Sequence, residues 1–182
     1  MLVPDSVLHT LLQAAVSASQ ASHGWILRLE GQELLVVASA GERAGEILGL
    51  RYPLGSDAAS FCVGSGQPFA SYSSNSKMKD TIAPMVGQPP SSILCVPCEE
   101  KGTMVGAIQV ADKKNAGSFD FDDVELISLM ADIAGAALVQ ASRLLELPSP
   151  EALVLDLQAL AQSDPARYST VASVIGMLVS HG

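Results

Sequence analysis

Apolar residues recur three and four positions apart near the start of the chain, which is the spacing of one helix face. This stripe predicts a helix over residues 5–22. Asp5 can accept hydrogen bonds from free backbone N–H groups as the N-cap, and His23-Gly24 ends the helix. The residues of the stripe are Leu8, Leu11, Leu12, Ala15 and Val16.

Two pairs of apolar runs, each joined by a short polar turn, predict two β-hairpins. Residues 25–29 and 33–40 form the first pair, and residues 91–97 and 103–111 form the second. Consecutive hairpins of this kind build an antiparallel sheet.

The stretch between the hairpins, residues 41–90, is polar and rich in Gly, Ser and Pro. Within it we expect a short helix over 56–66 and a short strand over 68–72. Residues 73–92 are typical of a loop, with one helical turn near Lys79. A connection this long in a compact domain is usually functional.

Helical periodicity returns over residues 121–146, 151–162 and 165–179. Asp164 followed by Pro165 is typical of an N-cap with proline at the first helical position. The whole pattern predicts an α+β fold, in which helices flank an antiparallel sheet. We divide the chain into an N-terminal helix (1–22), a central domain (23–146) and a C-terminal helical extension (147–182).

The long helix carries two apolar faces, although a helix that covers one sheet needs only one. It can lie between the sheet and the C-terminal helices, or it can form a homodimer bundle with the N-terminal helix; both can hold together. Small residues at 135–137 would let another helix approach closely. The first face holds Val124, Ile127, Met130, Ala131, Ala134, Ala137, Leu138, Ala141 and Leu145, and the second holds Leu126, Leu129, Ile133, Ala136 and Val139.

Composition narrows the classes of function. Hydrophobic residues make up 48% of the chain and charged residues 16%, which supports a large core and excludes a disordered chain. The chain has a net charge of −9, whereas binding of nucleic acid requires clustered positive side chains. An anionic membrane surface would repel a chain of this charge. We therefore expect neither nucleic acid nor a membrane as a partner.

Targeting signals are not evident in the sequence. The N-terminus has no basic region and carries Pro4 and Asp5 early, which does not fit a signal peptide. The most apolar helical run, Leu126 to Val139, is shorter than the roughly 20 residues of a membrane span. The cysteine count is three, and an odd number argues against a disulfide framework. We place the protein in the cytoplasm.

Three aspartates before the long helix raise the question of a metal site. A calcium loop starting at Asp112 would place lysine and alanine at ligand positions, and neither side chain coordinates calcium. Asp120 is better explained as the helix N-cap. Asp122 and Asp123 then lie in the first turn, where the helix dipole favours negative charge. We predict no metal and no cofactor.

From residue 23 to residue 142 the chain resembles a GAF domain, the small-molecule-sensing module of signalling proteins. The match to the cyclic-nucleotide-binding branch of that family extends over several stretches in order and spacing. These are 53-PLGSDAASFCVGSGQPFAS-71, 92-SILCVPC-98, 106-GAIQVADKK-114, and Phe119 with Asp123. The resemblance implies a GAF fold and a sensory or regulatory role.

The same branch carries a signature of Asn-Lys, then Phe, then three residues, then Asp-Glu. The corresponding positions here are Asp112-Lys113, Phe119 and Asp123-Val124, so Asp replaces Asn and Val replaces Glu. Lys113 ends a predicted strand and Asp123 begins a predicted helix. Their pairing would hold the helix start against the sheet, with Phe119 between them. We refer to Asp112, Lys113, Phe119 and Asp123 as the helix-start motif.

The resemblance places a ligand between the sheet and the middle segment, residues 73–92. A Phe-Asn or Phe-Asp pair of the family falls, by spacing, on Met78-Lys79. Met78 could cover a base, and Lys79 could meet an anionic group. Ser56, Thr81 and Ser92 complete the candidate ligand-binding set. The alternative is that Met78 belongs to the core and Lys79 is solvated.

Cys95 and Cys98 have the spacing of a redox motif, but they lie on a predicted strand. Residues i and i+3 of a strand point to opposite faces, so we expect neither a disulfide nor a shared metal. One GAF relative reduces free methionine sulfoxide with cysteines in and around its middle loop, whereas residues 63–94 here contain none. The chain also lacks a serine–histidine–aspartate pattern and a phosphate-binding loop.

These observations predict a non-catalytic GAF module that binds a small molecule, with a cyclic nucleotide as one candidate. We expect a homodimer that signals to a downstream protein through its flanking helices. The second hypothesis is a GAF-fold dimerisation and interaction scaffold with an empty pocket. An enzyme of the methionine sulfoxide reductase kind is the third.

Overall fold

The structure is a computed structural model that describes residues 3–42, 44–55, 57–72, 90–114, 117–146 and 148–180. The chain divides into two compact units, Met1–Ser142 and Arg143–Gly182. Each unit is described by itself. The predicted division at residues 22 and 146 stays a prediction.

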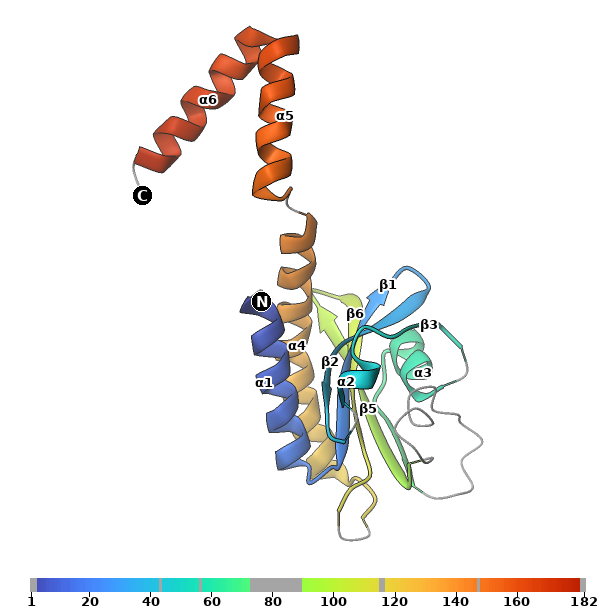
Figure 1. The fold of residues 1–182 in the computed structure, drawn as a ribbon. Helices are drawn as coiled ribbons and strands as arrows, with labels where there is room; N and C mark the ends of the chain where they lie inside the picture. Colours follow the sequence, from blue (N-terminus) through green and yellow to red (C-terminus); the bar gives the residue numbers. More distant parts are fainter. Residues whose placement is uncertain are drawn as a thin grey trace. The chain divides into compact units, whose positions relative to one another are not determined.

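A six-stranded antiparallel sheet in the order β3-β2-β1-β6-β5-β4 forms the centre of the first unit (Figure 1). The two predicted hairpins are confirmed as β1–β2 and β5–β6, and β1 joins β6 in the middle of the sheet. At the β5–β6 turn, Lys101 and Gly102 both have positive φ, as two-residue hairpin turns require. The strands are β1 His23–Glu30, β2 Glu33–Ala40, β3 Arg51–Pro53, β4 Phe69–Tyr72, β5 Ser92–Glu100 and β6 Thr103–Ala111.

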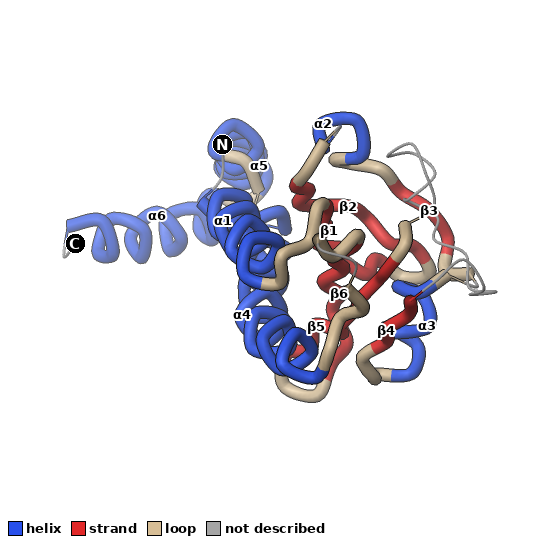
Figure 2. The backbone as a smooth tube through the Cα atoms, turned by 90° about the horizontal axis from the view of Figure 1, so that it is seen from below, coloured by secondary structure: helices blue, strands red, loops and turns tan. Residues whose placement is uncertain are grey.

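Helices cover both faces of this sheet. The helices of the first unit are α1 Val3–Ala18, α2 Ala44–Ile47, α3 Ala58–Ser65 and α4 Phe121–Glu146, the last of which continues past Ser142. Figures 1 and 2 show α1 and α4 side by side on one face, with α2 and α3 on the opposite side. The predicted α+β, GAF-like architecture is confirmed.

Three local predictions need correction. Helix α1 begins at Val3, so Asp5 lies in its first turn and does not cap it. It ends at Ala18, and His23 and Gly24 are the first residues of β1 instead of a helix end. Helix α2 and strand β3 were not predicted, because elements of three or four residues carry too little periodicity to be recognised.

The first hydrophobic cluster lies between the sheet and helices α1 and α4. Its buried residues come from α1 (Leu8, Leu12, Ala15), from all four long strands, and from α4 (Ile127, Ala131, Ala134, Leu138). A Cβ on Gly135 would lie 2.5 Å from the Glu99 carbonyl oxygen. Gly135 therefore lets α4 approach strand β5, and not another helix as the sequence suggested.

The second hydrophobic cluster lies on the opposite face. The strands contribute Trp25, Leu27, Leu34, Val36, Tyr52, Ile93, Cys95, Ala107 and Ala111, and helices α2 and α3 contribute Ile47, Ala58, Ala59, Cys62 and Val63. Helix α3 contacts β4, β5 and β6, whereas α2 contacts β2. This side of the sheet, which we call the α3 face, is thus covered by short elements.

The apolar part of helix α4 is longer than the sequence run Leu126 to Val139 that we compared with a membrane span. By length and composition alone, Phe121–Arg143 could cross a membrane, and it is the one such helix among the described residues. The core helix of a water-soluble domain passes the same test. Helix α4 buries Ile127, Ala134 and Leu138 against the sheet.

The second unit contains helices α5 Pro150–Ser163 and α6 Pro165–Ser180. Ser149 caps α5 by accepting from Ala152 N–H, at 3.1 Å. Asp164 accepts from Arg167 N–H at 3.0 Å, as predicted for the cap of α6. Neither helix contains a buried residue. The exposed apolar side chains of this unit include Leu155 on α5 and Leu178 and Val179 on α6.

Candidate functional site: the helix-start motif and the α3 face

The helix-start motif brings a strand end and a helix start together. Lys113 Nζ forms an ion pair with Asp123 Oδ2 and lies 3.5 Å from Asp120 Oδ2. The side chains of Lys113 and Asp123 are only 15% and 9% exposed, so solvent screens this pair poorly. Phe119 is buried in the first cluster, and its ring centroid lies 5.9 Å from Lys113 Nζ. The structure therefore places the Lys113 ammonium beside both the Asp123 carboxylate and the Phe119 ring.

Helix α4 starts with two reciprocal hydrogen bonds. Asp123 N–H donates to Asp120 Oδ1 at 3.1 Å, and Asp120 N–H donates to Asp123 Oδ2 at 2.9 Å. This is the arrangement of a capping box, in which two orphan N–H groups are satisfied together. The predicted N-cap role of Asp120 is confirmed.

Electrostatics at this point favour the charged forms. The hydrogen bond to Asp123 raises the pKa of Lys113, and the charges of Asp123 and Asp120 act in the same direction against a smaller effect of burial. The backbone hydrogen bond from Asp123 holds the pKa of Asp120 below its usual value, with the Lys113 ammonium adding to the effect. Both pKa shifts favour the charged forms of Lys113 and Asp120.

Asp112 and Ser92 act at a different place from the rest of the predicted set. Asp112 has φ +57°, a conformation that aspartate tolerates better than most residues. Its Oδ1 accepts from Ser91 N–H at 2.7 Å and Ser91 Oγ–H at 2.9 Å. Ser92 is buried, and its Oγ accepts from Lys113 N–H at 2.9 Å. These two residues join the start of β5 to the end of β6.

A row of paired residues crosses the α3 face. The register places Trp25 opposite Ser39 on β2 and Gln109 on β6, and Gln109 opposite Cys95 on β5. Directly paired residues of antiparallel strands share a face, so these side chains lie side by side. Ser39 Oγ–H donates to the Ala44 carbonyl at 2.7 Å, which joins the row to helix α2.

Two buried polar atoms of β1 have no hydrogen-bond partner in the described part of the chain. They are Trp25 Nε1 and His23 Nδ1, which belong to alternate residues and hence to the same face. Gly41, at φ +109°, allows His23 to fit, because a Cβ there would lie 2.6 Å from His23 Nδ1. Buried polar groups are nearly always bonded, so an unpaired pair on one face indicates a missing partner.

The start of helix α3 is the other polar feature of this face. Asp57 is buried and caps α3, with Ser60 N–H donating to its Oδ1 at 2.7 Å. Ser60 Oγ in turn accepts from Gly55 N–H at 2.9 Å. The predicted ligand-binding residues Ser56, Met78, Lys79 and Thr81 lie outside the described residues.

All three cysteines are buried as free thiols. Cys98 belongs to the first cluster and Cys95 to the second, so the expected opposite orientation on β5 is confirmed. Burial raises the pKa of the Cys98 thiol well above its usual value, which suppresses the reactive thiolate. Within the described residues, no group of three or more His, Cys, Asp or Glu could hold a metal ion.

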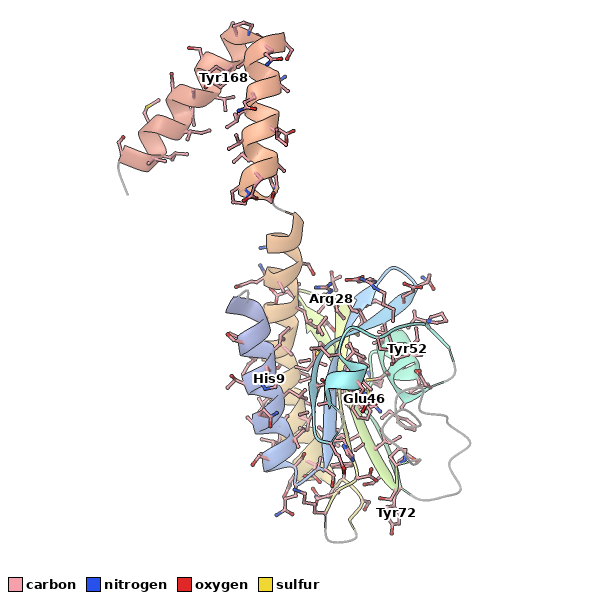
Figure 3. All side chains as sticks on the ribbon, in the orientation of Figure 1. His9, Arg28, Glu46, Tyr52, Tyr72 and Tyr168 are labelled. Atoms are coloured by element: carbon pink, nitrogen blue, oxygen red, sulfur yellow. The ribbon has the colours of Figure 1, made fainter. Side chains whose placement is uncertain are left out.

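A charged cluster fastens the edge of the sheet. Glu30 forms ion pairs with Arg28 and Arg51, which joins β3 to the β1–β2 hairpin (Arg28 is labelled in Figure 3). Burial pushes the pKa of Glu30 upward, but the hydrogen bonds from Arg51 and Arg28 outweigh it and keep the pKa below its usual value. The cluster is structural, because every charge has a partner within it.

Sequence reasoning did not identify Trp25, His23 or Asp57 as site residues. The alternation of β1 could have placed Trp25 and His23 on one face, had the strand been started at His23. Asp57 precedes a short helix by one position, which is a capping signal. That neither nitrogen has a partner among the described residues, however, depends on neighbours from β2, β6 and Gly41.

The GAF domain family model matches residues 2–139, and the chain belongs to this family. Among solved structures, the GAF domain of a phosphoenolpyruvate-protein phosphotransferase from Coxiella burnetii is similar, with a TM-score of 0.68 and 15% identity over 79% of this chain and 87% of that one. The GAF-B domain of DevS from Mycobacterium smegmatis has a TM-score of 0.61 and 20% identity, covering 77% and 96%.

An enzyme shares the same fold. The type II free methionine-R-sulfoxide reductase from Thermoplasma acidophilum has a TM-score of 0.63 and 21% identity, covering 75% of this chain and 93% of that chain. A comparison with curated proteins gives no match. At these identities the likeness shows the fold alone, and the family model does not distinguish a cyclic-nucleotide-binding branch.

Proposed function

We propose that this GAF domain is a non-catalytic sensor that binds a small molecule on the α3 face. The observation that carries the proposal is the pair of buried nitrogens, Trp25 Nε1 and His23 Nδ1, that lack partners among the described residues of this face. The opposite face is filled by α1 and α4, so the α3 face is where a ligand can complete the hydrogen bonding. A cyclic nucleotide remains one candidate ligand.

The absence of catalysis is part of the same proposal. The thiols of Cys62, Cys95 and Cys98 are buried, and the shifted pKa of Cys98 opposes formation of a thiolate. A reductase of the kind found in Thermoplasma acidophilum is therefore not favoured, although the fold is shared. If Cys95→Ser or Cys98→Ser abolished a measured reduction of free methionine sulfoxide, an enzyme would replace the sensor.

We further propose a homodimer that forms through α1 and α4. Val7 on α1 is 44% exposed, and Leu129 and Ile133 on α4 are 65% and 55% exposed. A shallow groove lined by Ser6, Val7, Thr10, Leu11 and Ala14 runs along α1. Two such adjacent helices from each chain can pack as a four-helix bundle. A downstream signalling protein and a cytoplasmic location complete the proposal.

A scaffold with an empty pocket is the second candidate function. The exposed apolar side chains of α4 and of helices α5 and α6 favour it, since large exposed apolar patches mark interaction sites. In that case the α3 face would bind no molecule and the helices alone would recruit a partner.

Native mass spectrometry of the protein as purified, repeated with cyclic AMP and cyclic GMP, separates these candidates. A dimer with extra small-molecule mass supports the sensor. A dimer that stays bare under every condition supports the scaffold and contradicts the sensor. A monomer at micromolar concentration contradicts the proposed interface, which the double variant Leu129→Glu and Ile133→Glu should also disrupt.

A further inference from the structure

Trp25 is the single tryptophan of the chain and lies on a central strand of the sheet. Its side chain is fully buried on the α3 face, between strands β2 and β6. The indole N–H can donate a hydrogen bond and cannot accept one. In the described part of the chain it donates to nothing, although burial has removed it from water.

His23 adds a second open atom two residues earlier on the same strand. Its Nδ1 is buried without a partner among the described residues. In a neutral imidazole, Nδ1 can be the donor or the acceptor, so it can adapt to the atom that it meets. A tryptophan that only donates and a histidine that can do either thus lie two residues apart on the same face of β1.

The surroundings of these atoms limit the chemistry of a ligand. The residues that pair with Trp25 across the α3 face, Ser39 and Gln109, are buried and uncharged, and no lysine or arginine is among the buried side chains of the described residues. The helix that covers this face, α3, is capped by a buried acid, Asp57, which does not favour an anion there. An anionic group on β1 would therefore be desolvated without a compensating positive charge.

We infer that strand β1 anchors the ligand through an uncharged hydrogen-bond acceptor, such as a carbonyl oxygen or a ring nitrogen. Trp25 Nε1–H donates to this atom, and His23 Nδ1 forms the second polar contact. The inference rests on the proposed function, because it describes how the α3 face holds the same small molecule. A charged part of the ligand, if present, lies away from β1.

The single tryptophan makes a direct test practical. Protein labelled with ¹⁵N-tryptophan gives one indole N–H resonance, which reports on Trp25 alone. The resonance is recorded for protein as purified, for protein stripped by unfolding and refolding, and for stripped protein titrated with cyclic AMP or cyclic GMP. Native mass spectrometry of each sample reports whether a small molecule is bound.

We expect the indole resonance to move downfield and its hydrogen exchange to slow in samples with bound mass. Trp25→Phe should then weaken binding about tenfold, the typical effect of one lost hydrogen bond. His23→Gln should weaken binding to a smaller extent. His9→Gln, a change on the exposed side of α1, is the matched control and should leave the affinity unchanged.

The outcomes separate the two proposals. If mass is bound but the indole resonance is the same in stripped and loaded protein, the anchor is wrong while the sensor stands. Equal affinity of Trp25→Phe and unmodified protein would also overturn the anchor. If no sample binds mass, the proposed function fails and the inference fails with it.

Discussion

The two faces of the sheet differ in how completely they are packed and hydrogen-bonded. On the side of α1 and α4, long helices fill the surface with apolar side chains, and helix and strand backbones come into direct contact at Gly135. On the α3 face, elements of four to eight residues cover the same strands, and two buried nitrogens have no partner among the described residues.

The difference indicates how one sheet can serve two purposes. A close-packed face leaves no room for rearrangement, because each change of volume must displace a neighbour. A face with unsatisfied polar atoms is less stable than it could be, and it gains stability when a partner arrives. The first face maintains the fold, and the second is the face on which we propose that a ligand binds.

The largest expected effect comes from adding a side chain at a tightly packed glycine on the side of the sheet that α1 and α4 cover. A side chain at Gly106 would overlap with the Leu27 carbonyl oxygen and press on Leu138, so Gly106→Val should destabilise the protein by about 4 kcal/mol or more. Gly64→Ala on α3, where the space is open, is the control and should be neutral or slightly stabilising. Urea unfolding measures both, and a mild effect of Gly106→Val would contradict the close packing of this face.

The ion pair at the start of α4 should have the next largest effect. Lys113→Met leaves Asp123 without its cation, and we expect a loss of about 2 kcal/mol for this partly buried pair. Lys114→Met is the control, because it removes the neighbouring lysine, which is exposed, and leaves the pair of Lys113 and Asp123 intact. A double-mutant cycle with Asp123→Asn should give a coupling energy; additive effects would show that the pair contributes nothing.

The same motif predicts how stability depends on pH. Because the folded protein raises the pKa of Lys113, its contribution is complete below about 10.5 and is lost as pH rises through the folded value. The lowered pKa of Asp120 acts oppositely, with a contribution present above 3.8 and lost as pH falls through the folded value. The melting temperature should therefore fall at high pH and at low pH. Lys113→Met should reduce the fall at high pH in particular.

On the α3 face, loss of the helix cap should have a moderate effect. Asp57→Ala removes the acceptor for Ser60 N–H and should cost about 1 kcal/mol. Asp57→Asn keeps a capping oxygen and is the matched control, with a smaller loss expected. Equal losses for the two variants in thermal unfolding would mean that the charge, and not the cap, is what matters.

An effect no larger than about that of a lost cap is expected from Trp25→Phe in ligand-free protein. The substitution keeps an aromatic ring in the core and removes a donor that has no acceptor among the described residues. Loss of packing is therefore offset, and the net change should stay below about 1.5 kcal/mol. Trp25→Ala, which leaves a cavity, should cost about 3 to 5 kcal/mol. A large loss for Trp25→Phe would show that the indole N–H is already bonded in the empty protein.

Much of the framework could be predicted from periodicity and end signals. The long helix was predicted with both of its ends, because Asp120 caps it and Pro148 follows it. Both hairpins follow from apolar runs around short polar turns. What these elements share is length: each repeats its pattern often enough to be distinguished from chance.

The site was less accessible to sequence reasoning. Lys113, Phe119 and Asp123 are ten residues apart or less, and the structure brings them together as the resemblance implied. Asp112, in contrast, bonds to Ser91, which is 21 residues away along the chain. Strand register decides which distant residues become partners, and tertiary packing decides which buried nitrogens lack one. A local sequence pattern contains neither kind of information.

The close contact between Gly135 and Glu99 has a mechanical consequence. Most helices rest on a sheet through flexible side chains, which absorb small displacements before they reach the next backbone. Here the helix backbone touches the carbonyl of β5 near its bulge, with no side chain between them to yield. A displacement of Glu99 would therefore press on the backbone of α4 directly, without a flexible side chain at this point to absorb it.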